Sequence, residues 1–104
     1  SLSRACEFSV CDLDFRLPAE RPTRNKPWQI AFTARNLNVI TVHLINPKPP
    51  YDCYRVWLTE QDRRRGKSTI PAGMVRDAGV MHVWLTGEHK YGRLTKKQDV
   101  VIGE

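Results

Sequence analysis

Short segments in which apolar and polar residues alternate are the feature that most restricts the fold of this 104-residue chain. In residues 54–58, Tyr54, Val56 and Leu58 take alternate positions, and residues 40–44 repeat the pattern with isoleucine, valine and leucine. Because successive side chains of a β-strand point to opposite faces, this spacing predicts strands with one buried face. Further strands are expected in residues 28–32, 80–85 and 100–102.

The first apolar segment, residues 6–17, changes the parity of its apolar positions partway along. Alternate residues of 6–10 share one face, whereas alternate residues of 13–17 share the other. A shift of one residue turns every later side chain to the opposite face. We therefore predict a bulge or corner near Cys11–Asp12.

Proline, glycine and asparagine separate these segments at the spacing of short turns. Pro71 suits the first position of a helical turn and Gly79 suits its end. Residues 59–67 are expected to form a hairpin tip that closes at Gly66, and residues 47–50 an extended, polyproline-like link. The chain is therefore predicted to be all-β: one antiparallel, immunoglobulin-like β-sandwich of about seven strands over residues 1–104, with one short helical turn. A small barrel is the alternative.

The overall composition fits a single globular domain. Apolar residues make up 40% of the chain, and the net charge is +6. No apolar run reaches the roughly 18 residues that a membrane-spanning helix needs, and no signal peptide is visible. Three cysteines (Cys6, Cys11 and Cys53) show no zinc-site spacing, so we interpret them as reduced thiols of a cytoplasmic chain, with a disulfide from Cys53 to either of the others as the alternative.

No motif of a known catalytic site is present. The three histidines, at positions 43, 82 and 89, lie in separate segments without an acid or a nucleophile at motif spacing. Asp12 and Asp14 share a strand face, which a solvated edge explains. We therefore expect no enzymatic activity, no cofactor and no metal site.

Two tryptophans, Trp57 and Trp84, fall on the strand faces that are expected to be exposed to solvent. If Tyr54, Val56 and Leu58 are buried, then Arg55 and Trp57 point outward; in the strand 80–85, His82 and Trp84 do the same. Aromatic residues beside arginine are typical of protein interfaces, so Arg55, Trp57, His82 and Trp84 are the candidate subunit interface. A loop such as 18–27 or 46–52 that covers the rings is one alternative, and a carbohydrate-binding platform is another.

A run of basic residues in the predicted hairpin tip is the candidate phosphate-binding site: Arg63, Arg64, Arg65 and Lys67. It defines the alternative function, a basic β-domain that binds nucleic acid. Glu60 and Asp62 precede the run, however, and no aromatic residue interleaves it for base stacking. A solvated, charged tip explains the same residues.

The second half of the chain, residues 53–104, resembles the closing part of a β-sandwich module of bacteriophage fibre and baseplate proteins. The matching features are Ile70-Pro71, Gly79, the strand Val80–Leu85, Gly87, Leu94-Thr95 and the final strand Val100–Ile102. Lys96 stands where such modules carry a second threonine.

The resemblance implies a virion structural protein: an attachment or assembly module of a phage fibre, baseplate or head appendage. It further implies contacts with other virion proteins, a homo-oligomer that is often a trimer, and assembly in the cytoplasm of the bacterial host. It carries over no catalytic residue.

Overall fold

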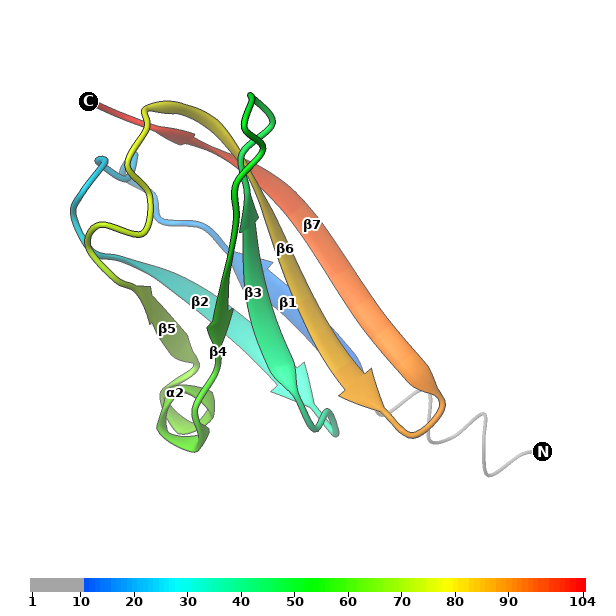
Figure 1. The fold of residues 1–104 in the computed structure, drawn as a ribbon. Helices are drawn as coiled ribbons and strands as arrows, with labels where there is room; N and C mark the ends of the chain where they lie inside the picture. The colour runs from blue at the N-terminus through cyan, green and yellow to red at the C-terminus, as the bar shows by residue number, and fades with distance from the viewer. Residues whose placement is uncertain (1–10) are drawn as a thin grey trace.

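The structure is a computed structural model that describes residues 11–104 (Figure 1). The predicted strand residues 6–10 and Cys6 lie outside the described residues. The described elements, in chain order, are β1 (Asp12–Arg16), β2 (Trp28–Arg35), β3 (Ile40–Ile45), β4 (Cys53–Trp57), α2 (Glu60–Arg65), β5 (Lys67–Ile70), β6 (Gly79–His89) and β7 (Gly92–Ile102).

These strands form two antiparallel sheets that lie one behind the other (Figure 1). The three-stranded sheet has the order β1-β2-β5, and the four-stranded sheet has the order β4-β3-β6-β7. The chain changes sheet between β2 and β3, between β4 and β5, and between β5 and β6. The predicted all-β, sandwich-like architecture is confirmed.

The core lies between the two sheets and contains the predicted alternating residues. Leu13 and Phe15 of β1 are buried, as are the inward-facing residues of the central strands β2, β3 and β6. Burial of these apolar side chains is the main favourable term for such a fold. The buried hydrophobic residues from the strands are Leu13, Phe15, Trp28, Ile30, Phe32, Ile40, Val42, Leu44, Ile70, Met81, Val83, Leu85, Val100 and Ile102.

The connection from β2 to β3 carries the chain from one sheet to the other. Asn36 has a left-handed backbone (φ 57°), which asparagine tolerates better than most residues. The turn places Leu37, which is 2% exposed, against Gly87 of β6. A Cβ atom at Gly87 would lie 2.6 Å from Leu37 Cδ1, so a larger residue here would force the Leu37 side chain to move.

The helix is not where the sequence predicted it. Residues 71–78, between β5 and β6, contain turns and bends but no helix: Met74 N donates to Pro71 O over 3.3 Å, and Gly73 has φ 86°. That left-handed residue prevents the helical turn from continuing. Gly79, the predicted helix end, instead begins β6.

The short helix is α2, in the segment that was predicted to be a hairpin tip. Thr59 and Asp62 form a reciprocal capping box, and Gly66 ends the helix in a left-handed conformation (φ 69°). A capping box satisfies two backbone donors that the first turn leaves unpaired. The prediction of a hairpin tip is therefore wrong: Thr59 and Gly66 cap the helix Glu60–Arg65, which connects the two sheets.

The last strand is much longer than its apolar end suggested. β7 runs over eleven residues from Gly92 and pairs with β6 along its whole length. Gln98 points to the other sheet, where its Nε2 donates to Phe15 O over 2.6 Å. This side-chain bond joins β7 to β1 at one side of the sandwich.

Candidate interaction face

The candidate site is the outer face of the four-stranded sheet, on the side away from the core. Alternation within each strand and the register between strands define its residues. All four residues of the predicted interface (Arg55, Trp57, His82 and Trp84) lie on this face; their role stays a prediction. The outer face comprises Thr41, His43 and Ile45 of β3, Cys53, Arg55 and Trp57 of β4, Val80, His82, Trp84, Thr86 and Glu88 of β6, and Arg93, Thr95, Lys97, Asp99 and Val101 of β7.

One row of residues crosses all four strands at the middle of the outer face. Arg55 is paired with His43, His43 with Trp84, and Trp84 with Lys97. Directly paired residues on one face of a sheet have neighbouring side chains. The register therefore brings together an arginine, a histidine, a tryptophan and a lysine that are far apart in the sequence.

The loops 18–27 and 46–52, which could have covered the outer tryptophans, do not lie over Trp57. This residue is 61% exposed. In the loop 18–27, the backbone N–H groups of Arg24 and Asn25 bond to Gly103 and Val75, next to the C-terminal end of β7. The loop 46–52 folds back on itself: Tyr51 N donates to Lys48 O over 2.7 Å. It is therefore a turn and not the predicted extended link, and it leaves the outer face uncovered.

Trp84 is half-buried, and its ring is in contact with a cation. Lys97 Nζ lies 4.3 Å from the ring centroid, within the range of a cation–π interaction. A carbohydrate platform needs free ring faces to stack on a sugar. Because Lys97 occupies one face of Trp84, the outer face does not present two free tryptophan rings side by side.

A shallow trough runs over the centre of the outer face. Two adjoining hollows, with volumes of ≈ 340 and ≈ 370 Å³, share His43, Arg55, Thr86 and Arg93. The first extends to Trp57 and Val39, and the second to Trp84 and Lys97. The trough thus has polar and basic groups at its centre and a tryptophan at either side.

His43 forms part of the trough and bonds to a neighbouring strand. Its Nε2 lies 2.9 Å from Thr86 Oγ1. Burial of the ring, and then the positive charges of Arg55 and Arg93, lower the pKa of His43 below its ordinary value of 6.5. The imidazole is therefore neutral at pH 7.

The other charges of the face are only partly paired. Arg93 donates to Glu88 over 2.9 Å, and His82 Nδ1 lies 2.7 Å from Asp99 Oδ1. Arg55 and Lys97 make no ion pair with any residue of 11–104. Two cations on the outer face, Arg55 and the ring-bound Lys97, therefore lack an acidic partner among the described residues.

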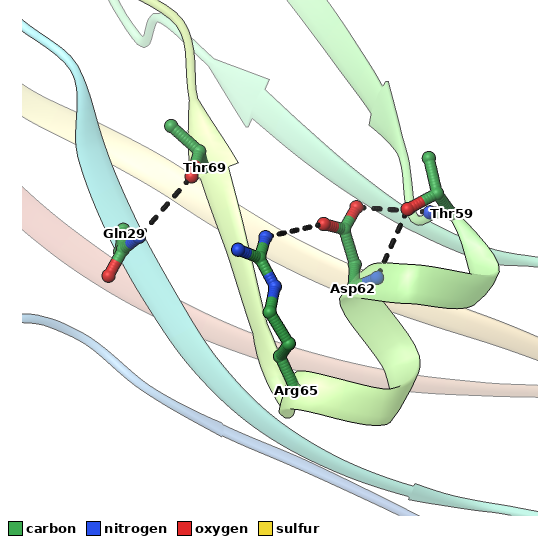
Figure 2. Close-up of polar contacts among 5 residues, drawn as sticks. All are labelled: Gln29, Thr59, Asp62, Arg65 and Thr69. Carbon is green, nitrogen blue, oxygen red and sulfur yellow. Dashed lines mark hydrogen bonds and ion pairs between the residues drawn. The ribbon is translucent and has the colours of Figure 1, made fainter.

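The structure separates the four candidate phosphate-binding residues. Arg63 turns back to the chain, where it donates to Leu37 O over 2.5 Å and to Asn38 O over 3.2 Å. Arg65 pairs with Asp62, the residue that also caps α2 (Figure 2). Arg64 and Lys67 are exposed. Two of the four cations thus serve the fold locally, and the run is not a row of free cations.

Sequence reasoning missed the residues that complete the trough: His43, Thr86, Arg93 and Lys97. Within its own segment, none of these residues has a motif partner that would single it out. The signal that unites them is the strand register, because His43 and Lys97 are the two neighbours of Trp84 across the sheet. No single segment contains that information.

Within residues 11–104, no group of three or more histidine, cysteine, aspartate or glutamate side chains could hold a metal ion. Over the same residues, no helix is both long enough and apolar enough to cross a bilayer. Comparisons of the chain with protein-family models, with curated proteins and with solved structures found no match.

Proposed function

We propose that this protein is a non-enzymatic structural module that attaches to another protein of a larger assembly through the outer face. The particular assembly that we propose is a bacteriophage particle, in which the module belongs to a fibre, baseplate or head appendage. The finer fold assignment that goes with this role is an immunoglobulin-like sandwich.

The observation that carries the proposal is an exposed aromatic and basic face on an otherwise well-packed sandwich. Trp57 is 61% exposed, beside Arg55. Tryptophan and arginine contribute more than other residues to binding energy at protein interfaces. A sheet that is apolar toward the core and also displays tryptophan outward is suited to contact a second surface.

The resemblance of residues 53–104 to phage appendage modules supports the choice of assembly. Two features of the fold are compatible with this choice: β6 and β7 form a long closing hairpin, and Ile70-Pro71 precedes β6, although residues 71–78 form turns in place of the helical turn found in such modules. The order of strands in the two sheets, β1-β2-β5 and β4-β3-β6-β7, is compatible with an immunoglobulin-like sandwich.

Nucleic-acid binding has less support. Three of its four candidate residues lie in α2, where Arg63 and Arg65 are engaged within the chain, so the number of free cations falls to two. A site that tracks phosphates gains affinity with each free lysine or arginine that it contributes.

The proposal is tested by asking whether the chain sediments with particles made by the cells that encode it. We expect it in the particle fraction at a fixed ratio to the main shell protein. Trp57→Ala should be lost from the particles, whereas Gln61→Ala, an exposed change on α2, should stay. Recovery of the unaltered chain only among freely diffusing proteins would contradict the proposal.

A further inference from the structure

The charges of the outer face restrict what can dock on it. Arg55 and Lys97 have no acidic partner within residues 11–104, whereas both acidic groups of the region are engaged: Glu88 with Arg93, and Asp99 with His82. A surface that meets this face therefore encounters unpaired positive charge. Charge complementarity between docked surfaces favours an acidic partner and disfavours a basic one.

A second copy does not fit the face well. Two copies that met through the same face would bring the two free cations of one against those of the other. The chain also carries a net charge of +6, so its remaining surface is not predominantly acidic. Like charges in a contact are costly, which points to a different protein.

We propose that the trough binds a carboxylate side chain from an acidic segment of a different protein of the assembly. This inference rests on the proposed function and specifies the partner's chemistry. Arg55 is the primary anchor, because its exposed guanidinium is unpaired and can bind a carboxylate with two parallel hydrogen bonds. Lys97 supplies a second positive charge at the far side of Trp84.

The remaining groups of the trough suit this ligand. Neutral His43 is fixed by Thr86 between the two cations, and Trp57 provides an exposed ring against which the carbon chain of a glutamate can pack. Arg93 already holds Glu88 at 2.9 Å. That pair, in which Arg93 donates one hydrogen bond, shows that an arginine of this trough can hold a carboxylate.

The test is the binding of a fluorescein-labelled hexaglutamate peptide to the purified chain, measured by fluorescence anisotropy at low salt. Arg55→Gln and Lys97→Gln together should weaken binding about tenfold, as expected for the loss of two exposed ion pairs. Arg55→Lys keeps the charge but loses the paired hydrogen bonds, so it should give an intermediate affinity. Arg64→Gln, which removes the same charge from exposed α2, is the matched control and should leave binding unchanged.

Several results would overturn the inference. They are no binding of hexaglutamate, equal weakening by Arg64→Gln, or tighter binding of an oligouronate or an oligothymidylate than of hexaglutamate. Self-association of the chain that Arg55→Gln abolishes would assign the face to a second copy. A chain that sediments with particles through Trp57 but does not bind hexaglutamate would keep the proposed function and reject this inference alone.

Discussion

Lys97 holds its ammonium group 4.3 Å from the centre of the Trp84 ring, across the pair of strands that close the four-stranded sheet. This contact divides the two tryptophans of the outer face into different roles. Trp84 is half-buried and packed under a cation, so it belongs partly to the fold. Trp57 is 61% exposed and is the ring that a partner can cover.

The first prediction concerns these two rings. Trp57→Ala should change the free energy of unfolding by no more than about 0.5 kcal/mol, the usual range for exposed sites. Trp84→Ala should cost about 1–2 kcal/mol, because it removes half-buried ring area and the lysine contact. Urea denaturation of the isolated chains measures both. A larger loss from Trp57→Ala than from Trp84→Ala would reverse the assignment.

The second prediction concerns the cap of α2. Thr59 Oγ1 accepts a hydrogen bond from Asp62 N over 3.1 Å, and Asp62 Oδ2 accepts one from Thr59 N over 3.0 Å (Figure 2). Thr59→Ala should lower the free energy of unfolding by about 1 kcal/mol, the typical cost of losing such a cap. Gln61→Ala, in the same turn but outside the cap, is the control and should have little effect. Equal effects of the two changes in thermal unfolding would show that the cap does not stabilise the connection between the sheets.

The third prediction follows from the lowered pKa of His43. Because the folded pKa lies below the ordinary value of 6.5, the unfolded chain takes up the proton first as the pH falls. The contribution of His43 to stability is therefore complete above pH 6.5 and declines below it, down to the folded pKa. Unfolding of His43→Gln should depend less on pH between 7.5 and 5.5 than unfolding of the unaltered chain.

Arg55→Gln gives a direct check of the cause. Since burial and then Arg55 lower the pKa of His43, removal of this positive charge should raise that pKa partway toward 6.5. NMR titration of the imidazole resonances measures it. A pKa that does not move would exclude the influence of Arg55 and leave burial and the charge of Arg93 as the causes.

The fourth prediction concerns the contact between Gly87 and Leu37. An alanine Cβ at position 87 would lie 2.6 Å from Leu37 Cδ1, and Leu37 is too well buried to move freely. Gly87→Ala should therefore destabilise the fold by about 1–3 kcal/mol, as overpacked cores do. In a Leu37→Ala background, the same change should cost much less. Additive effects in this double-mutant cycle would show that the two residues do not share the space.

Most of the fold could be predicted from the sequence because the core strands alternate clearly. Buried residues such as Phe15, Ile30 and Val42 were assigned to the correct faces by their spacing alone. The position of the helix could not be found in this way, because α2 has no buried residue and thus no apolar period. The sequence feature that indicates this helix is the capping-box spacing of Thr59 and Asp62. The three arginines that follow it favour instead the interpretation of a charged hairpin tip.

The candidate face was predictable in part. Arg55, Trp57, His82 and Trp84 were assigned to it from alternation within two strands. The trough could not be predicted, because it depends on which strands are neighbours in the sheet. It also depends on β7, a largely polar strand whose run of apolar residues lies at its C-terminal end. Lys97 joins the face only because β7 pairs with β6 over eleven residues.

Cys53 offers the most direct test of the claim that the outer face contacts another protein, because this exposed thiol lies on the face, paired with Ile45. A maleimide reagent is applied to the isolated chain and to the native assembly, and each labelled cysteine is identified by mass spectrometry of its peptide. The half-buried Cys11, directly before β1 of the other sheet, is the internal reference. We predict that Cys53 reacts in the isolated chain and is protected in the assembly, while Cys11 reacts alike in both. Equal labelling of Cys53 in both states would contradict the account.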